Sequence, residues 1–509
     1  MNHMTDKSTR GSRRQGLTET LEAKLANPET SPEFDLHKAV NDVLGDVGLT
    51  VADGGGKLTF YGQDPIIASP FRFGSMAAIG LAARSVALAA LWKHRTGEGQ
   101  DVAVDVRKAL RRFCGFNDGK WETINGRPPS AWGYAGTRFF KQPMLRETRD
   151  GRHVLAMDFY PKLRARMLNF LRCSESSESI DNAILQWRAD ELEMAAAEQG
   201  LVLGKVRSNE EFRRELQYSE VLAHMPLITI ERIGDSEPVP LARGGKHPLD
   251  GIRALGMGHV IAGGTIGRDL AYYGADVLNI WRPNDSEIEA FAWDVQVGMR
   301  STILDDSQED RARFDQLLSK ADVFFANKRP GFLKLHGLEA EELCARKPGL
   351  IHATVVLHGT KGPWSNRPGF DEIGATVAGL FALEGTLSRP QTPPILPICD
   401  NVVGWLGTVG ILAALRQRAL EGGSYRVTIS LTRTVLWLLS LGIFDKDYAK
   451  ATAGSSDEHA NIAPDLFTAE TPLGTYQGMT DQGVLSKTPG SFRTVLVPRG
   501  SSKPEWLER

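Results

Sequence analysis

Short apolar segments alternate with helical segments from Pro248 onward, and this alternation leaves few folds open to the chain. Strands are predicted at 251–255, 277–281, 322–327 and 350–356, with intervening helices at 261–275, 311–320 and 338–346. Strands that alternate with helices pack as a parallel sheet with helices on its faces, and ligands bind at the carboxyl ends of the strands. The sequence therefore predicts an α/β fold with a Rossmann-like sheet.

Composition divides the whole chain into further parts. We expect a polar N-terminal arm (1–45), a helical segment (46–125), a small α+β domain (126–235), a linker rich in proline, glycine and charge (236–248), the Rossmann-like domain (249–445) and an extended tail (446–509). The tail has little periodicity, and we expect it to wrap another part of the protein.

Two segments far apart in the chain share one pattern. Residues 74–106 and 404–431 each contain an apolar helix with a basic last turn, a glycine break and a short alternating strand. The shared Ala-Ala-Leu and the matching break indicate an internal duplication, although a helix followed by a strand is common enough to arise by coincidence. In this alignment Met76 or Ser75 stands opposite Asp400, so the first copy lacks the acid.

Asp400 precedes the long apolar helix of the second copy and admits two interpretations. As an N-cap, its carboxylate would accept backbone N–H bonds, and the helix dipole would favour its ionised form. Alternatively, an ionised carboxylate beside an apolar pocket is a nucleophile. The adjacent Cys399 is a weaker candidate, because no histidine lies nearby in sequence and a buried cysteine usually packs as a small apolar side chain.

Charge and cysteine content exclude several classes of partner. The net charge of −2 predicts no nucleic acid or anionic membrane as a partner, so local arginines and backbone amides must hold any anionic ligand. The four cysteines show no metal or disulfide spacing, which predicts a reducing compartment and no metal site. The N-terminus lacks the apolar core of a secretory signal, and we expect no apolar run long enough to span a bilayer. We expect a cytoplasmic protein, with organelle targeting by the basic N-terminus left open.

A glycine turn follows the first predicted strand. Gly263, Gly264 and Gly267 can receive a phosphate at the start of the helix, or can simply allow the helix to pack closely on the sheet. The second strand ends in Trp281-Arg282 rather than in an acid, which counts against NAD. Arg282 is either a phosphate ligand or an exposed residue at the strand end.

Several segments together resemble class III CoA-transferases of the formyl-CoA transferase and carnitine CoA-transferase type. They are 248–283, 298–305, 321–338, 359–380 and the stretch around Asp400, in the order found in that family. The resemblance implies a Rossmann-like sheet with a smaller α+β domain, interlocked in a homodimer. Here the material that resembles the acid-bearing helix and small domain, 74–230, precedes the Rossmann half. The site would therefore be completed within one chain or between chains.

The resemblance also implies a function, the transfer of CoA from an acyl-CoA to a carboxylic acid. Coenzyme A would be substrate and product, with no permanently bound cofactor and no metal. Asp400 matches the nucleophile, which forms an aspartyl–acyl anhydride and then an aspartyl–CoA thioester. Asp371 and Phe370 match secondary positions of the pocket. The matching CoA-binding positions are His259, Val260, Ala262, Arg282, Leu304, Asn327 and Lys328, and the matching lid glycines are Gly133 and Gly136, for which a plain loop is the alternative.

The sequence departs from this family at several positions, and two rival functions stay open. Ser307 replaces a lysine, Leu335 an arginine and Ala375 a glutamine, which affects the details of phosphate binding. Related α-methylacyl-CoA racemases have a histidine where Phe370 stands, so two-base proton transfer at the α-carbon lacks one partner here. An acyl-CoA racemase or isomerase is the second hypothesis, and a non-catalytic acyl-CoA-binding homologue is the third.

Overall fold

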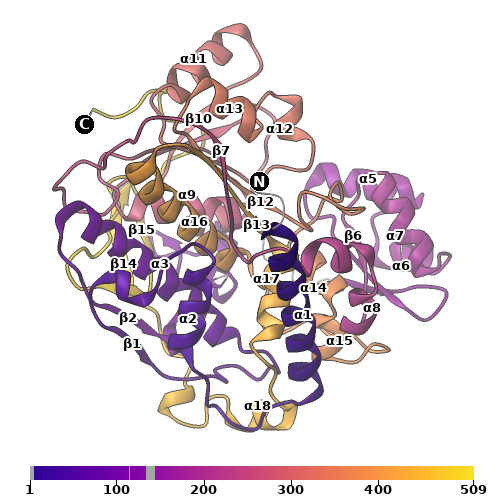
Figure 1. The fold of residues 1–509 in the computed structure, drawn as a ribbon. Coiled ribbons are helices and arrows are strands. Elements are labelled where there is room, and N and C mark those ends of the chain that lie inside the picture. Colours follow the sequence, from indigo (N-terminus) through magenta and orange to yellow (C-terminus); the bar gives the residue numbers. More distant parts are fainter. Residues whose placement is uncertain (1–4, 114, 133–143, 509) are drawn as a thin grey trace.

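The computed structural model describes residues 5–113, 115–132 and 144–508, and its centre is a seven-stranded sheet (Figure 1). The strand order is β10-β9-β8-β11-β12-β13-β7, parallel except that β7 joins β13 antiparallel. The strands are Thr229–Gly234 (β7), Arg253–Met257 (β8), Asp276–Trp281 (β9), Arg300–Ile303 (β10), Val323–Ala326 (β11), Ile351–Val356 (β12) and Ser424–Ser430 (β13). The predicted α/β class and parallel sheet are confirmed.

Helices cover both faces of this sheet. One face carries α9 (Ala262–Tyr272) and α16 (Asp400–Glu421), and the other carries α11 (Gln308–Leu318) and α13 (Ala340–Arg346). A Cβ added at Gly404 of α16 would lie 2.5 Å from the Cβ of Thr265 in α9, so glycine is required where these helices meet. The close packing brings the N-terminal ends of α9 and α16 to one place.

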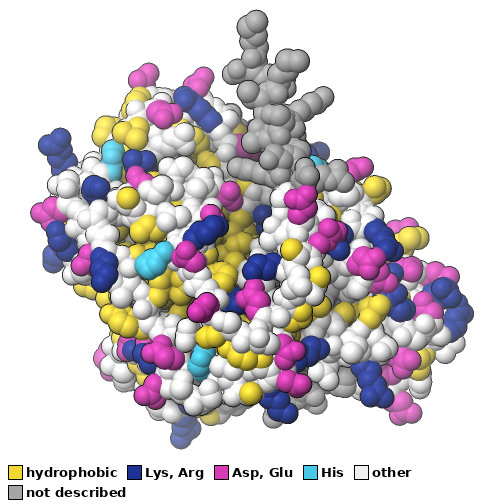
Figure 2. All heavy atoms as spheres, turned by 60° about the horizontal axis from the view of Figure 1, so that its bottom comes forward, with side chains coloured by type: hydrophobic (Ala, Val, Ile, Leu, Met, Phe, Trp, Pro, Cys, Tyr) yellow, Lys and Arg dark blue, Asp and Glu magenta, His cyan; other side chains and the backbone are white. Residues whose placement is uncertain are grey.

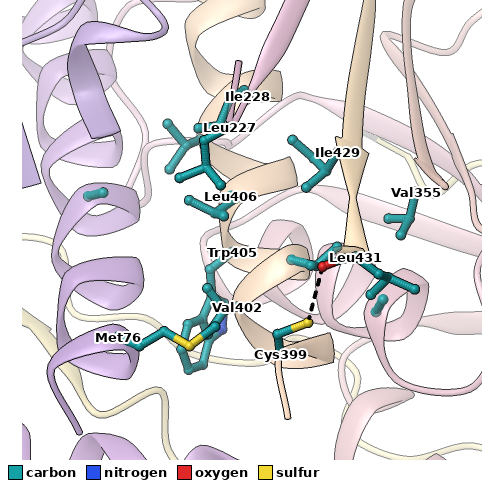
Figure 3. Packing of buried hydrophobic residues seen from close by; sticks show 14 of the residues in the cluster. Met76, Leu227, Ile228, Val355, Cys399, Val402, Trp405, Leu406, Ile429 and Leu431 are labelled. Atoms are coloured by element: carbon teal, nitrogen blue, oxygen red, sulfur yellow. Dashed lines mark hydrogen bonds between the residues drawn. The ribbon is translucent and has the colours of Figure 1, made fainter. Parts of the chain in front are cut away.

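The two segments that share a sequence pattern pack against each other. Helix α3 (Phe73–Thr96) lies along α16, and a Cβ at Gly80 would stand 2.9 Å from the Trp405 ring. A glycine follows each helix, and then a strand: β2 (Val102–Asp105) after α3 and β13 after α16. Met76 is fully buried and points toward Val402 and Trp405 (Figure 3). Met76, one of the two residues that the alignment places opposite Asp400, is thus an apolar side chain packed against α16.

Helix α3 contradicts the expectation that no apolar run of this chain is long enough to span a bilayer. By length and composition it is apolar enough to cross a membrane, and its most apolar window is wholly buried inside the protein. Arg84, in the middle of α3, donates to Asp269 of α9 at 2.8 Å and also pairs with Asp481. This buried ionic cluster joins the N-terminal segment, the Rossmann-like sheet and the C-terminal segment.

A small α+β unit precedes the sheet in sequence and lies at its side (Figure 1). Its elements are β4 (Leu145–Glu147), β5 (His153–Ala156), β6 (Leu203–Lys205), α5 (Pro161–Leu171), α6 (Ser177–Ile184) and α7 (Ala189–Glu198), and they enclose a separate apolar cluster. After α8 (Asn209–Arg213) the chain enters β7, which belongs to the central sheet rather than to the small domain as predicted.

Both terminal segments pack on the rest of the chain. The polar arm contains α1 (Thr5–Ala26) and α2 (Leu36–Gly45), and Leu21 of α1 is fully buried. The C-terminal segment contains α18 (Lys446–Thr452), β14 (Leu466–Thr471), β15 (Gly474–Met479) and β16 (Gly483–Leu485). Strand β16 pairs with β2, and β15 with β3 (Thr123–Ile124), so this segment does wrap the N-terminal part. On the face drawn in Figure 2, acidic and basic side chains are interspersed around apolar ones.

Candidate active site

Asp400 is the first residue of α16, and only 6% of its surface is exposed. Its side chain lines a narrow cavity at the joint between the small α+β unit and the Rossmann-like sheet. The other lining residues are Met144, Met157, Phe159, Val260, Ile261, Phe291, Phe370, Glu372 and Pro397. The first three belong to the small unit, which therefore reaches Asp400 within a single chain.

Asp400 does not cap its own helix, so that interpretation is wrong. The cap of α16 is supplied by Asp371, the first residue of α14 (Asp371–Ala378). Its Oδ2 atom accepts N–H bonds from Ile398 (2.7 Å), Cys399 (2.6 Å) and Asp400 (3.0 Å). Among the described residues, no side chain or N–H donates to the Asp400 carboxyl. That carboxyl is consequently available to a substrate.

Burial sets the charge of the groups around Asp400. Desolvation raises the pKa of Asp400 well above its ordinary value, and the negative charge of Asp371 raises it further. Burial and the same charge raise the pKa of Glu372 well above its ordinary value. They also raise the pKa of the Cys399 thiol, whose Sγ donates to Leu431 O at 3.7 Å (Figure 3). Cys399 is thus a neutral, buried thiol rather than a thiolate nucleophile.

The raised pKa of Asp400 predicts how a substitution changes stability with pH. A carboxyl whose pKa is higher in the folded state binds more protons there than in the unfolded chain, so its contribution to stability falls as pH rises above about 4. Asp400→Asn removes this effect. We expect the Tm of the variant to exceed that of the wild type at pH 8, with a gap that narrows toward pH 5. Thermal melts across this range would contradict the assignment if the gap were constant or reversed.

An aromatic wall closes the cavity from the side of the small unit. Phe370 stacks on Phe159 at a centroid distance of 4.7 Å and on Tyr160 at 6.2 Å. The Tyr160 hydroxyl donates to Glu287 Oε1 at 2.9 Å, and Glu287 Oε2 accepts the N–H of Val260 at 2.6 Å. Val260 has φ of +57°, a conformation that is rare for a β-branched residue. Tyr160 and Glu287 lie 127 positions apart and carry no sequence motif, so sequence reasoning missed both.

The predicted phosphate ligands lie in a separate groove. Arg282 lines a cavity of about 560 Å³ at the carboxyl ends of β9 and β10, where its Nη1 donates to Asp306 Oδ1 at 3.0 Å. Lys328 Nζ donates to Asp285 Oδ2 at 2.9 Å. The groove is lined by two cations, Lys162 and Arg282, and by the three carboxylates Asp285, Asp305 and Asp306. A phosphate at Arg282 would have to displace Asp306, which already pairs with that guanidinium.

The remaining predicted positions have structural partners. Asn327 brackets His259, accepting its N–H at 3.0 Å and donating to its carbonyl at 2.7 Å. Burial and the Lys328 charge lower the pKa of His259 to about 3, so the imidazole is neutral. Ala262 and Leu304 are buried. Gly133 and Gly136 lie outside the described residues. The structure thus brings Val260, Phe370 and Asp371 to Asp400 and places Arg282 and Lys328 elsewhere.

Residues 249–473, which include strands β8 to β13, Asp371 and Asp400, match the model of a family described as CoA-transferase family III. This region is similar to CoA-transferase family III. The acetyl-coenzyme A transferase nodX of Hypoxylon pulicicidum is 33% identical over 210 residues, covering 40% of this chain and 35% of that protein. The succinyl-CoA–D-citramalate CoA-transferase of Chloroflexus aurantiacus is 32% identical over 232 residues, covering 43% and 57%.

Solved structures are also similar to part of this chain. A crystal structure of a CAIB/BAIF family protein from Brucella suis is 28% identical, with a TM-score of 0.35, and the match covers 38% of this chain and 56% of that one. The chain spans about a third to three fifths of the length of these relatives.

Proposed function

We propose that this protein is a CoA-transferase that moves CoA from an acyl-CoA to a carboxylic acid, with Asp400 as the covalent nucleophile. The main support is the carboxyl of Asp400 at the start of α16, which lies beside a cavity and accepts no hydrogen bond from any residue that the structure describes, while Asp371 accepts the N–H groups of Ile398, Cys399 and Asp400. The family III match and the relatives named as CoA-transferases support the reaction type.

The proposed reaction has two symmetric halves. The Asp400 carboxylate attacks the thioester carbonyl and the C–S bond breaks. CoA departs as the thiolate, and an aspartyl–acyl anhydride remains on the enzyme. The thiolate then attacks the aspartyl carbonyl, releasing the first acid and forming an aspartyl–CoA thioester. The acceptor carboxylate attacks this thioester, and the expelled thiolate attacks the acceptor's carbonyl, which restores Asp400. Every step is acyl substitution without change of oxidation state, and each intermediate is activated for the next.

The ligand contacts and assembly of this enzyme are also proposals. We propose that CoA lies along the strand ends and contacts His259, Val260, Ala262, Arg282, Leu304, Asn327 and Lys328. We also propose a cytoplasmic homodimer. Because the small α+β unit already reaches Asp400 within one chain, the dimer is not needed to complete the walls of the cavity.

The hydrogen bond between Tyr160 and Glu287 predicts a measurable effect on the reaction. It ties the small unit to the loop that holds Val260 beside Asp400. Tyr160→Phe keeps the ring stacked on Phe370 but removes the bond, whose net value is about 1 kcal/mol. We expect a five- to tenfold lower kcat/KM with an unchanged fold. A variant with wild-type kcat/KM would show that the bond does not position the site.

Isotope exchange tests the proposed function without knowledge of the acceptor. An aspartyl–CoA enzyme returns CoA to the acid just released, so a labelled acid should enter its own acyl-CoA in the absence of a second carboxylic acid substrate.

The cavity also contains Glu372, a second acidic side chain near Asp400, which favours proton transfer at the α-carbon as the rival reaction. That rival predicts uptake of solvent deuterium at the α-carbon and no label exchange. A non-catalytic acyl-CoA-binding protein would show neither.

A further inference from the structure

We infer that the acyl group this enzyme accepts is apolar and carries no second carboxylate. The inference rests on the proposed function of Asp400 and specifies the class of its acyl-CoA substrate. It is drawn from the walls of the cavity beside the nucleophile, which differ chemically from the charged groove around Arg282.

The walls of the cavity are apolar and aromatic. Met157 and Phe159 contribute from the small unit, Phe291 from α10 (Glu289–Val295), and Phe370 from the segment before α14. Among the described residues that line it, the polar side chains are Glu372 and Asp400, and none is lysine, arginine or histidine. An acyl group bound here therefore meets carbon on most sides, and no cation among the described lining residues.

The cavity is also closed, which favours an apolar occupant. Its free space is about 10 Å³, room for about one water. The Phe159 and Phe370 rings are stacked with an interplanar angle of 25°. An acyl group can enter only if these side chains move apart, which exposes their apolar surface either to solvent or to the acyl group. An apolar acyl group covers that surface again and recovers its hydrophobic stabilisation, whereas a carboxylate does not.

Charge disfavours a dicarboxylic acyl group further. A second carboxylate, as in succinyl-CoA, would be buried close to the acidic side chains of Asp400 and Asp371, and no lysine, arginine or histidine among the described lining residues would serve as its counter-ion. His259 cannot serve as that ion, because its pKa of about 3 keeps it neutral. The relatives from Chloroflexus aurantiacus are named for succinyl-CoA, so the inference separates this chain from them by substrate.

Butyryl-CoA and succinyl-CoA form a matched pair for the test, because each acyl group has a four-carbon chain and only one ends in a carboxylate. Exchange of labelled butyrate into butyryl-CoA and of labelled succinate into succinyl-CoA would be measured under identical conditions. We expect kcat/KM to favour butyryl-CoA by at least about 100-fold. Equal rates, or faster succinate exchange, would overturn the inference while leaving the proposed transferase intact. No exchange with any acyl-CoA of a wider panel would overturn both.

A designed cation supplies a second readout. Met157→Arg places a positive charge in the cavity wall, and it should shift the butyryl-to-succinyl ratio of kcat/KM toward succinyl-CoA by at least tenfold. Because both substrates are measured on the same variant, general damage to the fold cancels in the ratio. A ratio that does not move would contradict the placement of the acyl group against this wall.

Discussion

Replacing Asp400 with asparagine is expected to lower the rate of acid exchange into acyl-CoA by at least about 10⁴-fold, as removal of a covalent nucleophile does. The amide is similar in shape but cannot displace CoA thiolate. The fold should persist, since Asp371 rather than Asp400 caps α16. Exchange kinetics together with a thermal melt of the same sample would measure both effects.

Two further variants control this experiment. Asp400→Ala should be equally inactive, and it excludes slow deamidation of the asparagine as a source of residual activity. Glu372→Gln tests the other acid of the cavity. The proposed acyl substitution uses no second acid, and burial raises the pKa of Glu372 toward the neutral form that glutamine resembles, so we expect this variant to keep its exchange activity within about tenfold. If it were as inactive as the Asp400 variants, the proton-transfer rival would gain support.

Replacing Asp371 with alanine should cause the largest loss of stability. The buried N–H groups of Ile398, Cys399 and Asp400, at and just before the start of α16, lose their acceptor. Each unsatisfied donor costs about 1–3 kcal/mol, so we expect a loss of roughly 3–5 kcal/mol. Urea unfolding would measure it. Asp371→Asn keeps one acceptor oxygen and should lose less. A loss below about 1 kcal/mol would show that the cap contributes little.

The first copy of the duplicated pattern offers a matched control. Asp64 is buried before α3 and accepts N–H bonds from Ile66 (3.2 Å), Gly74 (3.1 Å) and Ser75 (2.5 Å), much as Asp371 does for α16. Asp64→Ala should destabilise the protein by a similar amount. At a temperature where both variants are folded, only Asp371→Ala should lower kcat. Of the two helices whose starts these aspartates hold, only α16 begins with the nucleophile. Equal losses of kcat would mean that the effect is one of stability alone.

The central sheet could be predicted because its signals are local. Apolar strands such as 322–327 and 350–356 lie between amphipathic helices, and the structure places β11 and β12 there. Strand β10 was not predicted from the sequence because Arg300 and Ser301 are polar. In the structure the C-terminal segment covers these residues at the sheet edge, where Ser301 Oγ accepts the N–H of Gly500. Helix α1 was missed because its sequence is mostly polar, and its packing depends on contacts such as the buried Leu21.

The candidate site was predictable only in part. Asp400 could be identified from the apolar helix that follows it and from the resemblance around it. Its predicted capping role was wrong because the competing acceptor, Asp371, lies 29 positions earlier and reaches α16 only through the packing of α14. Tyr160 and Glu287 likewise meet only when the small unit docks on the sheet. Long-range contacts of this kind leave no periodicity in the sequence.

Intact-protein mass spectrometry after incubation with butyryl-CoA is the most direct test of the nucleophile. We expect a CoA- or acyl-sized adduct that hydroxylamine removes, that maps to the peptide containing Asp400, and that is absent from Asp400→Ala. An adduct on another residue, or exchange activity with no dependence on Asp400, would contradict it.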